Sequence, residues 1–266
     1  MSRPVISLTT DLGQADGYVG TMKGVILGIC PEATLIDISH DIRPQAVRQA
    51  AYVLSTAAPY FPPGAVHLVV VDPGVGSERR PIVVQTERAT YVAPDNGVLS
   101  MVLGQEPARR AIQIRVAESR YRLPEMSATF HGRDLFAPAA AHLACGVEPG
   151  ELGDPLPLSD LVTLPVLQPR QQPDGTWLGE VLHIDRFGNL VTNFQTPISK
   201  LQPPICIRVG EEQIVGLSRT YADVEPGEWV AYAGSSGYLE IAIREGNAAA
   251  RLGMEVGDPV HVEGRP

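Results

Sequence analysis

The first half of the chain switches repeatedly between two patterns of hydrophobic and polar residues. Short apolar runs predict strands at 5–9, 34–38, 66–71, 82–84 and 90–92. Apolar residues at helical spacing predict helices at 18–29, 44–60, 98–103 and 132–145, and Pro44 stands at the first position of the second helix. The run at 66–71 is almost wholly apolar, which is typical of a strand buried on both faces of a parallel sheet. Strands that alternate with helices predict a layered α/β domain with a mostly parallel sheet, which we assign to residues 1–160.

The pattern changes beyond residue 153. Prolines are frequent over 154–175, and the stretch ends in Gln-Gln-Pro-Asp-Gly, so we expect a linker at 161–176. Short strand-like segments separated by turn residues follow at 177–184, 190–193, 205–209, 212–217, 229–233, 238–243 and 259–262. One short helix, at 248–252, interrupts them. This pattern predicts an all-β domain, a small barrel, over residues 177–266.

Composition and charge narrow the class of protein. The chain has 266 residues, of which 44% are hydrophobic and 19% are charged, as in ordinary globular enzymes. Its net charge of −9 disfavours nucleic-acid binding, which needs a basic surface. The apolar stretches are too short to span a bilayer, and the start of the chain does not resemble a signal peptide. We therefore expect a cytoplasmic protein that binds neither nucleic acid nor membrane.

The cysteines favour the same compartment. Cys30, Cys145 and Cys206 lie far apart, their number is odd, and none belongs to a CxxC motif. This pattern predicts reduced thiols that serve as small buried hydrophobic residues, and neither a disulfide framework nor a zinc ribbon.

Three polar clusters fall where ligands bind in open α/β sheets, namely 9–13, 71–80 and 129–134. In the first, Asp11 is suited to accept hydrogen bonds from both hydroxyls of a ribose. The alternative is that Asp11 or Asp16 caps the helix that follows. For the second cluster the alternative is a Pro-Gly turn with two solvated arginines, and for the third a structural histidine near a helix start. Two further clusters, 185–193 and 234–239, are typical of hairpin turns.

No established motif for a metal or cofactor is present. The six histidines form no HExxH pair and no cluster with cysteine, and the chain has neither a GxSxG elbow nor a phosphate loop. Asp72, His131 and Asp134 are a conceivable set of ligands for a divalent ion, so a metal-dependent hydrolase stays open as an alternative. The sequence otherwise predicts no metal and no cofactor.

Taken together, these clusters resemble one family. The matching segments run in order through both predicted domains, at 9–13 with Asp16, 18–20, 22–24, 71–76, 93–97, 129–134, 187–189 with 192–193, and 235–239. The combination is similar to the S-adenosylmethionine hydroxide adenosyltransferases, which are relatives of the fluorinases and chlorinases. The resemblance implies an N-terminal α/β domain and a C-terminal β-barrel. It also implies a homotrimer whose sites lie between the N-terminal domain of one subunit and the C-terminal domain of the next.

The resemblance implies binding roles for single residues. Asp11 corresponds to the residue that holds the ribose hydroxyls. Asp185 and Ser235 fall where the family binds the methionine part of the substrate. Asn189 and Ala248 fall where it contacts the adenine.

The resemblance also implies a catalytic set. The hydroxide-using members carry an Asp-Arg-His set that maps onto Asp72, Arg79 and His131. The halide-using members have a tyrosine where this chain has Asp72 and a halide-binding serine where it has Gly132, so both differences favour water over halide. A third difference is Ser236, where a fluorinase has arginine, and it leaves open how the methionine carboxylate is held.

The implied reaction is hydrolysis of S-adenosyl-L-methionine to adenosine and L-methionine, by in-line attack of water or hydroxide at the ribose C5′. The sulfonium is already a good leaving group, so the difficult part is the nucleophile, because the pKa of bulk water is about 15.7. Arg79 would stabilise developing hydroxide, His131 could take up a proton, and Asp72 could orient either water or the histidine. Two alternatives on the same fold are a halide-using transferase and an adenosyl-ligand-binding regulator without turnover.

Overall fold

The computed structural model describes residues 3–117, 120–165, 168–196 and 202–265. The chain forms two compact units, Met1–Pro165 and Val166–Pro266, called here the N-terminal and C-terminal units. Residues on both sides of their boundary are ordered. In the N-terminal unit the backbone N–H groups of Val162 and Leu164 donate to Asp95 and Ser100. In the C-terminal unit the short strand β8 (Arg170–Gln171) pairs with β9 (Trp177–Ile184). Both stretches fall within the expected linker at 161–176.

The N-terminal unit is built on a seven-stranded sheet with the order β2-β1-β3-β5-β4-β6-β7. Its strands are β1 (Val5–Thr10), β2 (Thr34–Ser39), β3 (Ala65–Val70), β4 (Pro81–Gln85), β5 (Ala89–Pro94), β6 (Arg110–Ile114) and β7 (Gly153–Leu156). Its helices are α1 (Tyr18–Ile29), α2 (Val47–Ala57), α3 (Ser100–Gln105), α4 (Ala137–Ala144) and α5 (Pro149–Leu152). Short 3₁₀ turns stand at Ala58–Tyr60 and Leu158–Asp160, and a π-helical turn at Gly132–Phe136 leads into α4.

The sheet is mixed, so the expectation of a mostly parallel sheet is wrong. β1 pairs in parallel with β2 and β3, and β3 with β5. β4 pairs antiparallel with β5 and β6, and β6 with β7. The segment between β4 and β5 is a tight turn in which Thr86 N–H donates to Ala89 O, and it is far too short for the crossover that a parallel pair needs. β6 and β7 escaped prediction because Arg110, Gln113, Asp154 and Pro155 interrupt their apolar pattern.

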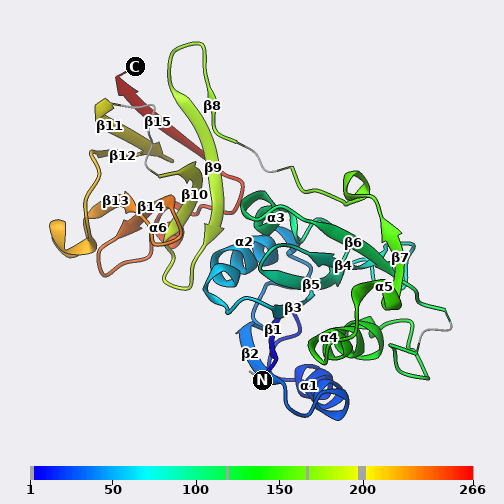
Figure 1. The fold of residues 1–266 in the computed structure, drawn as a ribbon. Coiled ribbons are helices and arrows are strands. Elements are labelled where there is room, and N and C mark those ends of the chain that lie inside the picture. Colours follow the sequence, from blue (N-terminus) through cyan, green and yellow to red (C-terminus); the bar gives the residue numbers. More distant parts are fainter. Residues whose placement is uncertain (1–2, 118–119, 166–167, 197–201, 266) are drawn as a thin grey trace. The chain divides into compact units, whose positions relative to one another are not determined.

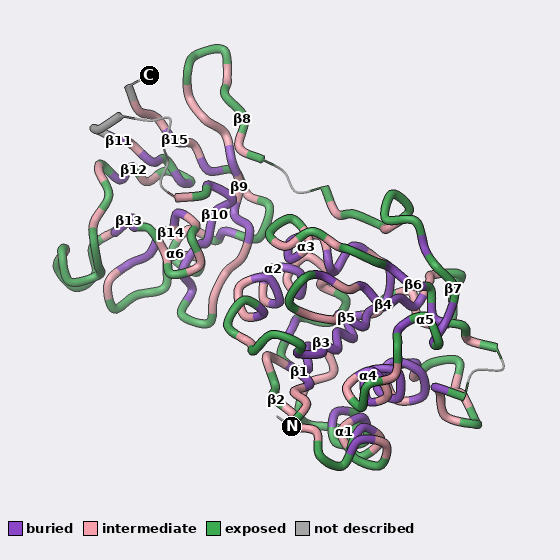
Figure 2. Tube along the Cα trace, in the orientation of Figure 1, coloured by how far each residue is buried: buried purple, intermediate pink, exposed green. Residues whose placement is uncertain are grey.

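Helices cover both faces of this sheet (Figure 1). On one face, α1 and α4 pack against β1 and β3 through Met22, Ala140 and Leu68. On the other face, α2 and α3 pack against the sheet through Leu54, Val102 and Val69. β3 is buried along its whole length between the two layers, as the apolar run at 66–71 predicted (Figure 2).

The second helix begins later than predicted. α2 starts at Val47, and Pro44 is not its first residue. Gln45 has a positive φ of 67°, and its backbone N–H donates to Asp11 Oδ2 at 2.7 Å. The hydrogen bond to the Asp11 carboxylate thus fixes a tight turn where the sequence suggested a helix.

Two of the three cysteines form a disulfide, so the expectation of reduced thiols is wrong for them. Cys30 follows α1 and Cys145 follows α4, and their Cα atoms lie 5.9 Å apart. The two helices pack side by side, which brings these helix ends together despite a sequence separation of 115 residues. Cys206 is free and partly buried.

The C-terminal unit is a nearly closed antiparallel barrel, as expected. Its strands follow the order β12-β11-β15-β9-β10-β14-β13. They comprise β9 with β10 (Leu190–Gln195), β11 (Gln202–Val209), β12 (Glu212–Val215), β13 (Trp229–Ala233), β14 (Tyr238–Ile243) and β15 (Pro259–Arg265). An isolated β-bridge between Ser218 and Tyr232 links the two ends of this strand order, so the barrel is nearly closed. A 3₁₀ turn at Tyr221–Asp223 and the helix α6 (Ala248–Leu252) are the helical elements among the residues described in this unit.

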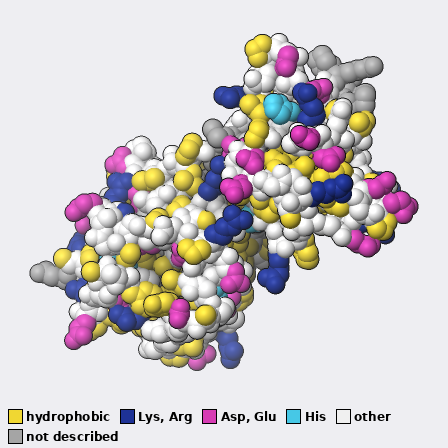
Figure 3. Space-filling model, turned by 180° about the vertical axis from the view of Figure 1, so that it is seen from behind, with side chains coloured by type: hydrophobic (Ala, Val, Ile, Leu, Met, Phe, Trp, Pro, Cys, Tyr) yellow, Lys and Arg dark blue, Asp and Glu magenta, His cyan; other side chains and the backbone are white. Residues whose placement is uncertain are grey.

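Acidic and basic side chains are interspersed over the face of the molecule seen in Figure 3. Among the described residues, every helix is too short or too polar to cross a bilayer.

Candidate functional site

The three polar clusters predicted in the N-terminal unit meet at one edge of its sheet. Thr10 and Val70 end β1 and β3 and pair with each other in the parallel ladder. Asp11 follows Thr10 directly and Asp72 lies two residues beyond Val70, so both carboxylates leave the sheet at its carboxyl edge. The third cluster joins them at Gly132, where an added β-carbon would lie 3.1 Å from Val70 Cγ1.

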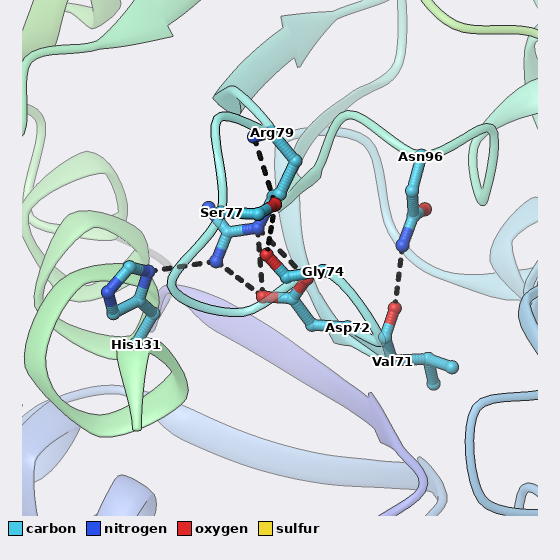
Figure 4. Close-up of polar contacts among 7 residues, drawn as sticks. All are labelled: Val71, Asp72, Gly74, Ser77, Arg79, Asn96 and His131. Atoms are coloured by element: carbon cyan, nitrogen blue, oxygen red, sulfur yellow. Dashed lines mark hydrogen bonds and ion pairs between the residues drawn. The ribbon is translucent and has the colours of Figure 1, made fainter. Parts of the chain in front are cut away.

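Asp72, Arg79 and His131 form a continuous polar cluster (Figure 4). Arg79 Nε donates to Asp72 Oδ1 at 2.9 Å and to Oδ2 at 3.0 Å, and Arg79 Nη2 also binds Oδ2. Arg79 Nη2 lies 2.9 Å from His131 Nδ1. The side chains of Arg79 and Asp72 are only 9% and 7% exposed, so water screens their ion pair weakly. The sequence-predicted catalytic set is therefore one physical unit.

The loop after β3 turns back on itself and returns Arg79 to Asp72. Gly74 O accepts hydrogen bonds from both the backbone N–H and the hydroxyl of Ser77. A β-carbon at Gly74 would lie 3.1 Å from Arg79 Cγ, so glycine leaves room for the arginine side chain. Asn96 Nδ2 donates to Val71 O at 2.9 Å and anchors the start of the loop (Figure 4). The Pro-Gly turn is real, but Arg79 is not a solvated arginine.

The contact with Arg79 fixes the protonation of His131. A guanidinium has only donors, so His131 Nδ1 must accept, and the hydrogen of the neutral ring then sits on Nε2. Burial and then the positive charge of Arg79 hold the pKa of His131 below its usual 6.5, against the opposing effect of Asp72 and Asp134. The cluster thus combines a permanent cation with a neutral imidazole that can donate from Nε2.

Asp134 supports the site without lining it. It is fully buried, and both its oxygens bind the Arg133 guanidinium, at 2.5 and 3.0 Å. Its Oδ2 also accepts from Ser127 N–H at 2.7 Å, which orders the loop before His131. The carboxylates of Asp72 and Asp134, proposed as ligands for a divalent ion, are thus each occupied by an arginine. Within the described residues, no group of three His, Cys, Asp or Glu side chains is arranged to hold a metal ion.

Asp11 is held at the edge of the sheet by its neighbours. Its Oδ2 accepts from Gln45 N–H, and the preceding Thr10 hydroxyl lies 2.8 Å from His40 Nδ1. The helix-capping alternative fails, because the N-cap of α1 is Gly17 and no side chain bonds there. Neither Asp11 nor Asp16 caps that helix.

The predicted residues of the C-terminal unit lie in or beside hairpin turns. Asp185 Oδ1 accepts from the backbone N–H of Phe187 and of Asn189, so it closes the turn between β9 and β10. Asn189 is buried and lines a cavity of about 660 Å³ within this unit. Ser235 is exposed in the turn between β13 and β14, and Ala248 is fully buried at the start of α6.

Sequence analysis did not single out three side chains that connect to Asn189. Asn189 Nδ2 donates to Tyr221 OH at 3.1 Å, Tyr221 OH contacts Tyr232 OH, and Tyr232 OH donates to Glu240 Oε2 at 2.7 Å. The Ser236 side chain, flagged as a difference from the fluorinases, also hydrogen-bonds Glu240. No sequence signal links Tyr221 to the other two, because each stands in a different element.

Two family models match the chain. The S-adenosylmethionine (SAM) hydroxide adenosyltransferase N-terminal domain matches residues 6–153, and the corresponding C-terminal domain matches residues 179–261. The (R)-S-adenosyl-L-methionine hydrolase of Thermus thermophilus is 43% identical over 98% of this chain and 99% of its own length. That of Methanocaldococcus jannaschii is 38% identical over 97% of this chain and 95% of its own length. The fluorinase of Nocardia brasiliensis is 29% identical over 98% of this chain and 97% of its own.

A solved structure has the same fold. An uncharacterized conserved protein from Thermotoga maritima superposes with a TM-score of 0.89 at 36% identity, and the match covers 98% of this chain and all of the other.

Proposed function

Because this chain belongs to the SAM hydroxide adenosyltransferase family, we propose that it hydrolyses S-adenosyl-L-methionine with the Asp72–Arg79–His131 cluster activating the water. In this reaction a water oxygen bonds to the ribose C5′, the C5′–S bond breaks with its electron pair going to sulfur, and one proton is released. The products are adenosine and L-methionine. The observation that carries the catalytic assignment is the bonded chain from Asp72 through Arg79 to His131 at the carboxyl edge of the sheet.

Each member of the cluster has a distinct part. Arg79 lowers the energy of hydroxide, because its charge is permanent and lies in a weakly screened site. His131 donates a hydrogen bond from Nε2 to the attacking oxygen, since its Nδ1 already accepts from Arg79. Asp72 is a positioning residue, because both its oxygens are engaged by Arg79. The cluster therefore stabilises bound hydroxide, and it need not take the proton from water directly.

The remaining predicted residues bind the substrate in this proposal. Asp11 holds the ribose hydroxyls, Asp185 and Ser235 hold the methionine part, and Asn189 and Ala248 contact the adenine. The homotrimer with shared sites, which the resemblance implies, belongs to the proposal too, and sedimentation of an active monomer would contradict it. A cytoplasmic location also remains a proposal, although the Cys30–Cys145 disulfide is less usual there.

Crowding at Gly132 supports water over halide. A β-carbon there would lie 3.1 Å from Val70 Cγ1 and 3.2 Å from both Met22 Sδ and Phe130 Cε2. A serine able to bind halide would therefore force its neighbours to move. The charge of Asp72 is paired with Arg79, so it does not by itself discriminate between hydroxide and halide.

The test is to run the reaction in oxygen-18 water with high chloride. Label should enter adenosine at its 5′ hydroxyl, and 5′-chloro-5′-deoxyadenosine should be absent or minor. Dominance of the chlorinated nucleoside would establish the halide-using transferase, and binding of substrate with no product at all would establish the regulator.

A further inference from the structure

Asn189 is a buried polar residue at the cavity of the C-terminal unit. The residue is 4% exposed, and it shares the lining of the cavity with Phe187, Thr220, Tyr221, Ala222, Ile243, Arg244, Glu245 and Gly246. A single amide in such a wall can offer a ligand either a donor or an acceptor, depending on which way it points. The contacts of Asn189 decide between the two.

The Asn189 amide has one chemically sensible orientation. Its Nδ2 donates to Asp185 Oδ2 at 2.8 Å and to Tyr221 OH at 3.1 Å, which uses both of its hydrogens. The reversed amide would place Oδ1 against the Asp185 carboxylate, where two acceptors would repel each other. Asp185 cannot turn away, because two backbone N–H groups hold its other oxygen. Oδ1 therefore remains as the amide atom available to a ligand.

Which partner donates in the hydrogen bond between Asn189 and Tyr221 is set at the other end of a series of hydrogen-bonded side chains. Glu240 carries the carboxylate, so Tyr232 OH donates to it, and Tyr232 is then free to accept from Tyr221. Tyr221 in turn donates its hydroxyl hydrogen to Tyr232 and can only accept a hydrogen bond from Asn189. Burial, together with the hydrogen bonds from its neighbours, raises the pKa of Tyr232, so its phenol stays protonated. Every donor in the chain points toward Glu240.

We infer that Tyr221, Tyr232 and Glu240 act with Asp185 to hold Asn189 Oδ1 toward the ligand, and so make this site select a purine that bears a 6-amino group. An exocyclic amino group donates to Oδ1, whereas a 6-oxo group would set one acceptor against another. The inference rests on the proposed function, because that proposal places the nucleobase at Asn189. It adds Tyr221, Tyr232 and Glu240 as positioning residues, gives Asp185 a second role and supplies a reason for selectivity.

The experiment measures binding of adenosine, purine riboside and inosine to the full chain by calorimetry at pH 8, an alkaline pH chosen because burial raises the pKa of Glu240. Wild-type protein should bind adenosine at least about tenfold more tightly than inosine, with purine riboside between them, because inosine leaves a buried acceptor unpaired. Tyr221→Phe removes one of the two anchors of the amide, so the adenosine-to-inosine ratio should fall toward one. Tyr232→Phe removes the acceptor for Tyr221 and should lower the ratio less.

The ratio separates positioning from simple packing, because a loss of packing weakens all three nucleosides alike. Tyr60→Phe is the matched control, since Tyr60 is 83% exposed in the N-terminal unit, and it should keep the wild-type ratio. An unselective wild type overturns the inference, as does an unchanged ratio in both Tyr221→Phe and Tyr232→Phe. If Tyr221→Phe does not fold, the Tyr232→Phe ratio decides. The same wild-type preparation is assayed with S-adenosyl-L-methionine. Turnover without selectivity refutes only this inference, while absence of turnover refutes the proposed function.

Discussion

The Asp72–Arg79–His131 cluster of the N-terminal unit and the Asn189–Tyr221–Tyr232–Glu240 series of the C-terminal unit both have a carboxylate behind the groups that we propose face the ligand. In the first, the carboxylate binds a guanidinium, which in turn binds a neutral imidazole. In the second, only neutral hydroxyls lie between the carboxylate and the amide. The first arrangement presents a positive charge, and the second presents a fixed direction of hydrogen bonding.

The difference follows from what each group must do. Developing hydroxide is charged, so a buried cation stabilises it strongly, and the cost of burying that cation is offset by its ion pair with Asp72. A nucleobase is neutral, so an oriented dipole recognises it without the desolvation cost of an extra ion. In the proposed function, the charged cluster lies where bonds change, and the oriented hydrogen bonds lie where the nucleobase is recognised.

Substitution of Arg79 is the most severe test of this comparison. Arg79→Ala should lower kcat by roughly 10²–10³-fold with little change in KM, because the cation acts on charge that develops only during attack. Steady-state kinetics with S-adenosyl-L-methionine measure both constants. Arg109→Ala is the control, since Arg109 is 63% exposed and pairs only with the exposed Glu87. A raised KM with unchanged kcat would remove Arg79 from the catalytic set.

Asp11 sharpens the comparison, because it lies in the N-terminal unit and yet is assigned to recognition. Asp11→Ala should raise KM by about ten- to 100-fold and alter kcat less, since the ribose hydroxyls change little during attack. Asp11→Asn keeps an acceptor for Gln45 N–H and should lie between Asp11→Ala and wild type. Asp41→Ala, at an exposed position nearby, should behave as wild type. A loss confined to kcat would show that Asp11 acts in the chemical step and not in recognition of the ribose.

The smallest expected effect is in the pH profile. The folded-state pKa of His131 lies below its usual 6.5, so the ring is neutral at pH 7 and above, and kcat should be constant there. As the pH falls further, through the lowered pKa of His131, protonation of Nδ1 would set it against Arg79, and kcat should decline several-fold. Stability should decline in the same direction, because the unfolded state binds the proton more readily.

The profile has its own control. His261→Asn replaces a partly buried histidine in β15 and should keep the acid limb, whereas His131→Asn should flatten it. An acid limb unchanged in His131→Asn would assign the titration to another group.

The strongly periodic elements could be predicted from sequence because their signals are local. The run at 66–71 predicted a buried strand, whereas Asp72, Arg79 and His131 were singled out by the family resemblance, and their catalytic role stays a prediction. Pairing is different, since it depends on which segments meet in space. The antiparallel half of the sheet and the Cys30–Cys145 bond were therefore missed.

The candidate recognition chain shows the same limit. The role of Asn189 was implied by the family resemblance, whereas Tyr221, Tyr232 and Glu240 stand in a 3₁₀ turn and two strands and were not singled out. Tyr232 and Glu240 face each other across the β13–β14 hairpin, and the contact of Tyr221 with Tyr232 is the part that depends on the tertiary fold. A hydrogen-bond chain of this kind has a direction but no sequence pattern.

The Cys30–Cys145 disulfide determines how a mechanical force would pass through the N-terminal unit. Tension applied between the chain ends would cross directly from the end of α1 to the end of α4. The intervening segment spans a separation of 115 residues, or about 400 Å of extended chain, and it would carry none of that load. Asp72, Arg79 and His131 all lie inside this loop, whereas Asp11 lies outside it, directly after the loaded strand β1. A pull from the ends would therefore load the segment that carries the proposed ribose contact, while the covalent path of the force bypasses the cluster proposed to activate water.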